Sequence, residues 1–225
     1  MLEVICETVQ DAISAATAGA DRIELVSALC DGGLTPSIAL VEHVCNYVMI
    51  PVRVMIRPHA RSFVYDIYDK DVILKDLEQI KKTKAEGVVF GALTNEGHID
   101  EPFLKDIISN KGSLKLTFHR AIDEATDYHQ ALEVLTQYPV NAILTSGGCL
   151  DAIKAIPIYN QHKNVFTHHQ VECLAGKGIT LENLEQLLKE TSLQAIHMGS
   201  GLQSSGHVDP EKVANARKII DQHIL

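Results

Sequence analysis

Short apolar runs alternate with helical segments along the whole chain, and this alternation limits the fold more than any other feature. In the clearest repeat, an apolar strand at 21–26 carries the ionisable Glu24, paired glycines follow, and Thr35 and Pro36 open a helix. A threonine hydroxyl accepts a free backbone N–H at a helix start, and proline needs no N–H at the first helical position. Strand, glycine loop and capped helix make one β/α unit.

Eight such units fit the 225 residues at about 28 residues each, close to the smallest size of a (β/α)₈ barrel. The expected strands lie at 2–6, 21–26, 52–57, 87–91, 114–119, 142–145, within 165–174, and 194–198. The expected helices lie at 7–18, 36–48, 69–85, 101–109, 127–137, 150–159, 180–190, and from 210 onward. Strands that are apolar without alternation are typical of parallel strands buried on both faces. We therefore predict an α/β fold, a single TIM-barrel domain over residues 1–225. An open doubly wound sheet shares the alternation but does not need eight units.

The acidic balance of the chain argues against two classes of partner. Its 29 Asp and Glu against 20 Lys and Arg give a formal net charge of −9, which disfavours nucleic acid and anionic membranes as main partners. No apolar run approaches the roughly 20 residues that cross a bilayer, and no targeting segment is evident at the N-terminus. The five cysteines are scattered without a CxxC pair, as expected for reduced thiols. We expect a cytoplasmic protein.

Ionisable residues gather where the expected strands end, and in a barrel this edge carries the chemistry. Burying each of them costs free energy unless it is paired, so a structural ion pair is the alternative for any single one. Glu24 is a candidate general base, or an acceptor of hydrogen bonds from Arg57, which suits bidentate capture of a carboxylate or phosphate. His119, Arg120 and His197 complete the candidate catalytic set, with either histidine as an acid–base group or a ligand.

Glycine turns follow the seventh and eighth expected strands, where barrels often bind phosphate. Gly176 and Gly178 flank Lys177 in the first turn, and Gly199 and Gly201 form the second. Backbone N–H groups and the Lys177 ammonium would bind an anion there. The alternative is that these glycines only permit tight connections.

Sulfur ligands raise the question of copper, because Cu(I) prefers thiolate and thioether groups. Cys6, Cys30 and Cys173 map near the expected barrel top, and Met198 could join them. These cysteines are the candidate metal ligands. The chain has no CxxC or MxxM spacing, so spacing alone does not predict a preformed site.

Six segments in their order along the chain resemble the CutC family, whose proteins are named for copper homeostasis. They are residues 19–25, 32–37, 55–58, 87–94, 117–121 and 144–147. The resemblance implies a TIM barrel, a cytoplasmic location, association of the chain with itself, and copper binding or copper tolerance.

Two positions depart from the family pattern, and both concern ligands. Val26 stands where the family commonly has a cysteine, and Lys177 alters the turn after the seventh strand. Glu24, Arg57 and His119 also suit an oxygen-rich organic substrate better than soft Cu(I). Two functions therefore stay open: a copper-handling protein that binds Cu(I), and an enzyme acting on a small anionic or sugar-like metabolite.

Overall fold

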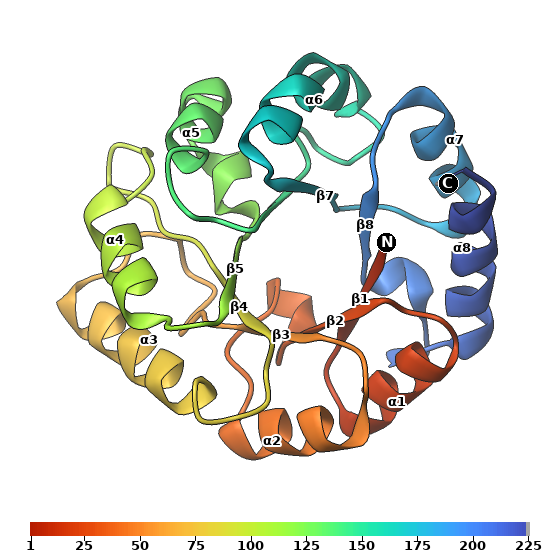
Figure 1. Ribbon diagram of the computed structural model, residues 1–225, viewed down its shortest axis with the longest axis horizontal. Coiled ribbons are helices and arrows are strands. Elements are labelled where there is room, and N and C mark those ends of the chain that lie inside the picture. The colour runs from red at the N-terminus through yellow and green to blue at the C-terminus, as the bar shows by residue number, and fades with distance from the viewer. Residues whose placement is uncertain (224–225) are drawn as a thin grey trace.

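Eight parallel strands close into a barrel in the order of the sequence, with helices around the outside (Figure 1). The computed structural model describes residues 1–223. The strands are β1 (Leu2–Cys6), β2 (Arg22–Leu25), β3 (Val52–Met55), β4 (Gly87–Phe90), β5 (Lys115–Phe118), β6 (Ala142–Thr145), β7 (Glu172–Ala175) and β8 (Ala195–Met198). The first strand closes the ring against the last, where Leu2 pairs with Ile196. The predicted TIM barrel is confirmed.

The connections after the strands form the helical layer. The helices are α1 (Val9–Thr17), α2 (Ile38–Tyr47), α3 (Ile67–Ile80), α4 (Glu101–Asn110), α5 (Tyr128–Leu135), α6 (Ile156–His169), α7 (Leu181–Glu190) and α8 (Pro210–His223). Short 3₁₀ turns follow β2, β5 and β8, namely η1 (Leu29–Asp31), η2 (Arg120–Glu124) and η3 (Ser200–Leu202). A two-stranded hairpin, β9 (Gln203–Ser204) with β10 (His207–Val208), precedes α8.

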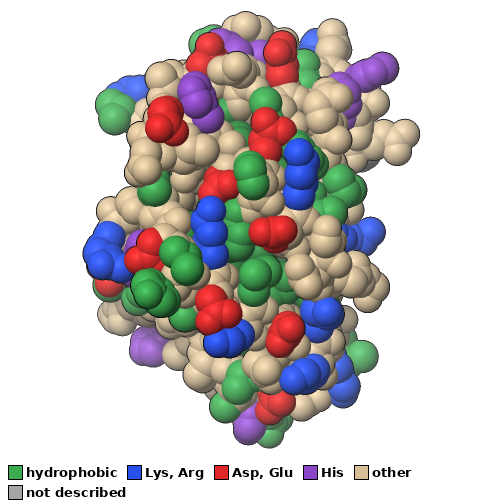
Figure 2. Space-filling model, turned by 90° about the vertical axis from the view of Figure 1, so that its left-hand side faces the viewer, with side chains coloured by type: hydrophobic (Ala, Val, Ile, Leu, Met, Phe, Trp, Pro, Cys, Tyr) green, Lys and Arg blue, Asp and Glu red, His purple; other side chains and the backbone are tan. Residues whose placement is uncertain are grey.

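The main core lies between the strands and the helices. Phe90 on β4 illustrates this packing. The centre of its ring lies 5.3 Å from that of Phe103 of α4 and 6.3 Å from that of Phe118 of β5, and both pairs pack edge to face. On the outer face around α3 and α4, acidic and basic side chains are interspersed (Figure 2). Among residues 1–223, no helix has the length and apolar character needed to cross a membrane.

The helix after β2 starts two residues later than predicted. The Ser37 hydroxyl caps α2 by accepting the N–H of Leu40 at 3.3 Å. The predicted cap, Thr35, is used elsewhere, because its hydroxyl accepts the N–H of Arg57 at 2.9 Å and donates to the carbonyl of Arg57 at 3.2 Å. Thr35 therefore ties the loop after β2 to the end of β3.

The largest error in the predicted elements concerns α6 and β7. The structure extends the helix to His169 and starts the strand at Glu172, whereas the prediction ended the helix at 159 and placed the strand within 165–174. Tyr159 and Phe166 are both buried and lie seven residues apart, so they share one face of α6. Gln170, with a φ of 56°, ends the helix in the left-handed region.

Candidate active site

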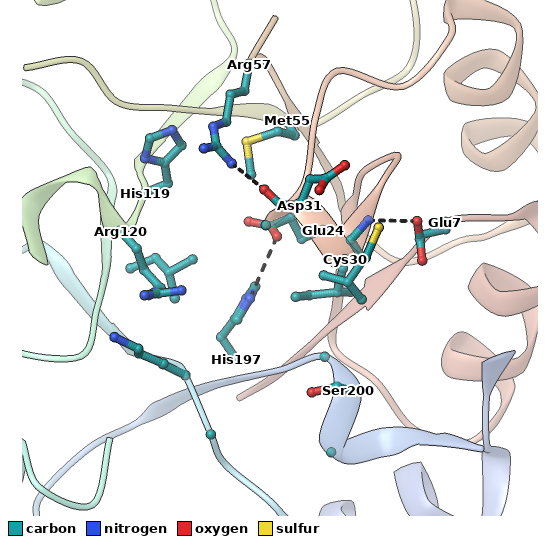
Figure 3. Close-up of a pocket in the computed structure, with 18 of the residues that line it drawn as sticks. Glu7, Glu24, Cys30, Asp31, Met55, Arg57, His119, Arg120, His197 and Ser200 are labelled. Atoms are coloured by element: carbon teal, nitrogen blue, oxygen red, sulfur yellow. Dashed lines mark hydrogen bonds and ion pairs between the residues drawn. The ribbon is translucent and has the colours of Figure 1, made fainter. Parts of the chain in front are cut away.

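A pocket of about 730 Å³ opens at the carboxyl ends of the strands (Figure 3). This volume suits a small metabolite. The pocket brings together ten of the predicted site residues: Glu24, Arg57, His119, Arg120, Lys177, Gly178, His197, Gly199, Gly201 and Cys30. Three predicted residues do not line it: Gly176, Cys6 and Cys173.

Glu24 and His197 form the floor of the pocket, and the carboxylate of Glu3 contacts His197 from outside the pocket lining. Glu24 turns inward because its neighbours Ile23 and Leu25 pack outward into the helix-facing core. His197 of β8 lies between two acids, with its Nδ1 2.7 Å from Oε1 of Glu3 and its Nε2 3.7 Å from Oε2 of Glu24. Figure 3 shows His197 pointing at Glu24. None of the three residues is more than 5% exposed, so their charges act on one another without screening by water.

Below this floor lies a buried ion chain, which consists of Glu3, Arg22 and Glu172. Glu3 accepts a hydrogen bond from Nε of Arg22, and Nη2 of Arg22 lies 2.6 Å from Oε1 of Glu172. Arg53 of β3 also lies inside the barrel and donates to the Thr117 hydroxyl at 2.6 Å. The lower part of the barrel interior is therefore held by hydrogen-bonded charges, and Glu3 links it to the pocket.

These contacts set the protonation of the floor. Burial would raise the pKa of Glu3, but the hydrogen bond from His197 and the charge of Arg22 outweigh it and lower the pKa to about 2. Glu24 has no hydrogen-bond donor of this kind, and its burial raises its pKa to about 7. Burial opposes protonation of His197, yet the carboxylates of Glu24 and Glu3 give it a raised pKa. Near neutral pH, Glu24 can therefore both give and take a proton.

Arg57 and His119 also line the pocket and lie side by side in Figure 3. Nη1 of Arg57 donates to the carbonyl of Asp31 at 3.1 Å, and the guanidinium lies 4.6 Å from the centre of the Phe63 ring. Of the two alternatives for Glu24, the hydrogen bond from Arg57 is not formed among residues 1–223, because Nη1 of Arg57 donates to the carbonyls of Asp31 and Gly33 instead.

The surroundings of His119 lower its pKa, whereas those of His197 raise the pKa of that residue. Burial and the charge of Arg57 lower the pKa of His119 to about 3. Its Nδ1 accepts the N–H of Ala121 at 3.1 Å, so the proton of the neutral ring is on Nε2. His119 is thus a neutral hydrogen-bond donor near pH 7, which makes His197 the better of the two predicted histidines for acid–base chemistry.

Three pocket residues leave buried polar atoms without a hydrogen-bond partner within residues 1–223. They are Oε1 of Glu24, Nε of Arg57 and Nε2 of His119. Buried polar atoms are nearly always paired, so an acceptor and two donors left open around one pocket indicate a site that a polar ligand completes.

The rim of the pocket is built from the turns after β5, β7 and β8. Nε of Arg120 lies 3.2 Å from Oδ2 of Asp123, and Nζ of Lys177 donates to the carbonyl of Cys149 at 3.1 Å. A Cβ on Gly201 would lie 2.2 Å from the carbonyl oxygen of Ile179. Glycine therefore allows the two last turns to pack backbone against backbone, which places Lys177 beside the pocket.

Asp123 of η2 organises the turn after β6, and no sequence pattern indicated this role. Its carboxylate accepts hydrogen bonds from the backbone N–H groups of Ser146, at 2.9 Å, and Gly148, at 3.1 Å, and from the hydroxyl of Thr145, at 2.6 Å. These donors are therefore occupied by the protein itself. Glu3 was also missed, although it shows the same signal as Glu24, an acid within an apolar strand.

The three candidate copper ligands lie in different surroundings. Cys6 is fully buried in the helix-facing core, and Cys30 is exposed on η1 at the rim. Cys173 of β7 lines a separate pocket of about 370 Å³ beside α6. Burial raises the pKa of the Cys6 and Cys173 thiols, which disfavours the thiolate form that binds metals.

One group of side chains within residues 1–223 meets the geometry of a metal site with three His, Cys, Asp or Glu ligands. It consists of Glu3, Glu24 and His197, whose ligand atoms lie within 4.8 Å of one another. Glu3 bonds Nδ1 of the imidazole while Glu24 faces Nε2, so an ion on Nε2 would be held by Glu24 and His197, with Glu3 orienting the ring. Oxygen and imidazole donors do not fit Cu(I), which selects sulfur.

Comparison with known proteins identifies relatives over most of the chain. The model of the CutC family matches residues 1–202. A CutC family protein of Aliivibrio fischeri is 36% identical over 199 residues, which covers 88% of this chain and 80% of the relative. The copper homeostasis protein cutC homolog of Mus musculus is 36% identical over 197 residues, covering 88% and 72%.

Solved structures agree with these relatives. The crystal structure of CutC from Streptococcus agalactiae has a TM-score of 0.80 at 26% identity and covers 90% of this chain and 99% of its own. A phosphoribosylanthranilate isomerase from Thermotoga maritima shares the fold alone, with a TM-score of 0.65 at 14% identity and coverage of 98% and 97%. The chain belongs to the CutC family.

Proposed function

We propose that the barrel mouth is the active site of an enzyme that acts on a small anionic or sugar-like metabolite. The observation that carries this proposal is Glu24, whose Oε1 is buried at the pocket floor without a partner among residues 1–223, while its Oε2 faces His197. A carboxyl group with a pKa of about 7 is suited to general acid–base catalysis at neutral pH.

The other charged residues supply binding and orientation. Glu3 holds Nδ1 of His197 and so directs Nε2 toward Glu24. Arg57, Arg120 and Lys177 place three cationic groups around the pocket, which favours a substrate that carries a carboxylate or phosphate. A cytoplasmic location and association of the chain with itself stay predictions.

Copper handling is the second candidate function, and one observation favours it besides the name of the mouse relative. The sulfur-bearing side chains of Cys30 and Met55 both line the pocket (Figure 3). A single exposed thiol and a thioether form a weak site compared with clustered thiolates. We therefore place the catalytic proposal first.

Replacing Cys30 by serine is expected to leave the Cu(I) affinity of the protein unchanged, because the structure does not gather the cysteines. Titration of Cu(I) from a coloured chelator measures this affinity, and Cys45→Ser on α2 is the matched control. Stoichiometric tight binding that Cys30→Ser removes and Cys45→Ser retains would make Cys30 a copper ligand and would favour the second candidate.

A metabolite that binds the pocket is expected to raise the melting temperature, and Arg57→Lys is expected to remove most of that rise. A ligand at one hundred times its Kd stabilises by about 2.7 kcal/mol, which is roughly 5–10 °C for a chain of this size. Lysine keeps the charge but lacks the unpartnered Nε donor of Arg57.

The measurement is thermal unfolding against metabolite fractions from a cell extract and a panel of hydroxyaldehydes, hydroxyketones, their phosphate monoesters and carboxylic acids. Arg61→Ala, on an exposed residue of the same loop, is the control. If no fraction or compound shifts the melting temperature, the proposed active site is wrong.

A further inference from the structure

Two rigid donors, of Arg57 and His119, line the same pocket as the acid–base carboxylate of Glu24. We propose, resting on the active site proposed above, that the reaction is proton transfer at a carbon next to a carbonyl group. Arg57 and His119 hold the carbonyl oxygen, and Glu24 moves the proton. The substrate class is a hydroxyaldehyde, hydroxyketone or keto acid that carries an anionic group.

The guanidinium of Arg57 is fixed before any ligand arrives. Its Nη1 donates to the carbonyls of Asp31 at 3.1 Å and Gly33 at 3.3 Å, and Phe63 covers its face. Within the described part of the chain, residues 1–223, these contacts leave Nε without a partner. A donor held in place by the protein stabilises a developing negative charge without reorganising, which is the requirement for an oxyanion site.

The imidazole of His119 is fixed as closely. A Cβ on Gly91 would lie 2.5 Å from its Nδ1, so glycine at the end of β4 makes the space that the ring fills. Phe63 packs on the ring at 4.9 Å between centres, and Ala121 donates to Nδ1. The N–H at Nε2 is the donor that remains, and its nitrogen is buried without a partner.

A neutral imidazole is the appropriate group for this role. Because the pKa of His119 is lowered to about 3, the ring donates a hydrogen bond near pH 7 without carrying a charge. Neutral histidines polarise substrate carbonyls in this way in other barrel enzymes. Arg57 beside it supplies the positive charge, so the pair combines a neutral and a cationic donor.

The acceptor of the proton, Glu24, lines the same pocket. The Glu24 carboxylate takes the proton from the carbon, the electron pair of the C–H bond forms a C=C bond, and the carbonyl π pair moves to oxygen. Arg57 and His119 stabilise the enolate oxygen formed. Glu24 then returns the proton to the same carbon or to the neighbouring one, which gives epimerisation or isomerisation. Atoms and electrons balance without an oxidant or reductant.

Two cationic side chains at the rim indicate where the anionic group of the substrate would bind. Arg120 is partly exposed, and Lys177 lines the pocket on the side of the last two turns. An anionic group several bonds from the carbonyl would reach them while the carbonyl stays between Arg57 and His119.

The test uses the compound that raises the melting temperature, incubated with the whole protein in D₂O and followed by ¹H NMR. We expect the signal of the C–H next to the carbonyl to disappear as deuterium enters. His119→Ala should slow this exchange by about 100- to 1000-fold, the usual effect of removing one oxyanion donor. His119→Gln keeps an amide N–H and should recover part of the rate, and circular dichroism checks that both variants fold.

Three results would overturn the inference. The stabilising compound has no C–H next to a carbonyl, or it has one that does not exchange, or it exchanges as fast with folded His119→Ala as with the wild type. In each case the pocket still binds its ligand, so the reaction class fails while the binding site stands. If no compound raises the melting temperature, the active site itself is wrong and the inference falls with it.

Discussion

Replacing Glu24 by glutamine is expected to lower turnover of the stabilising compound by about 10²- to 10⁴-fold, the range for losing a general acid–base group. Glutamine has nearly the same shape but cannot exchange a proton, so the fold and the ligand-induced rise in melting temperature should remain. Glu124→Gln is the matched control, because Glu124 lines the same pocket but is exposed. Equal turnover in Glu24→Gln and the wild type would exclude Glu24 as the proton-transfer group.

The pH dependence of Glu24 follows from its surroundings. Burial, together with the charge of Glu3, raises its pKa to about 7 from an ordinary 4.5, against the opposing charges of His197, Arg22 and Arg120. As a base it must be ionised, so kcat/KM should rise as pH passes about 7, and Glu24→Gln should lose this rise.

The free energy of unfolding should change with pH in the opposite direction to kcat/KM. A carboxyl whose pKa is raised by folding contributes stability below its ordinary pKa, and this contribution is lost as pH rises from 4.5 to about 7. Urea unfolding of both proteins across this window measures the difference. The free energy of unfolding of the wild type should fall relative to that of Glu24→Gln as pH increases; a constant difference would contradict the raised pKa.

Replacing Arg22 by methionine is expected to lower the free energy of unfolding by about 3–5 kcal/mol, because removing one partner of a buried ion pair leaves an uncompensated charge. Arg22 is 6% exposed and binds both Glu3, which is fully buried, and Glu172. For a chain of this size the melting temperature should fall by roughly 10 °C. Urea or thermal unfolding measures both quantities.

Two further variants separate the buried charge from the general effect of losing an arginine. The double variant Arg22→Met with Glu3→Gln should recover part of the loss, since no unpaired carboxylate is then left beside the methionine. Lys75→Met removes an exposed pair with Asp71 on α3 and should change stability little. An effect of Arg22→Met as small as that of Lys75→Met would show that the ion chain does not hold the barrel interior.

The sequence allowed the fold and half of the site to be predicted for identifiable reasons. Alternation of strands and helices is local, so eight units could be counted, and an acid between apolar neighbours, as at Glu24, must face inward in a barrel strand. Glu3 shows the same pattern near the N-terminus and could have been found by it. Its link to His197 spans 194 residues and depends on barrel closure, which no local pattern records.

The predictions that failed depended on competition between partners. Thr35 is a suitable helix cap, but its hydroxyl is hydrogen-bonded to the backbone of Arg57 instead. Arg57 could have donated to Glu24, but it donates to the carbonyl of Asp31 instead. The sequence does not specify the path of the loop that places this carbonyl beside it. The prediction ended α6 at 159 and not at His169, because polar residues around a buried Phe166 fit a strand as well as one face of a helix.

The seam between the first and last strands has a consequence for the order of events during folding. His197 belongs to β8, and the residue that orients it, Glu3, belongs to β1, so their hydrogen bond forms only when the two ends of the barrel meet. Contacts of such long sequence separation are the slowest to form. A chain still being synthesised, or folded only as far as β7, would carry Glu24 without its partner. The proton transfer proposed for Glu24 and His197 therefore requires that the barrel has closed.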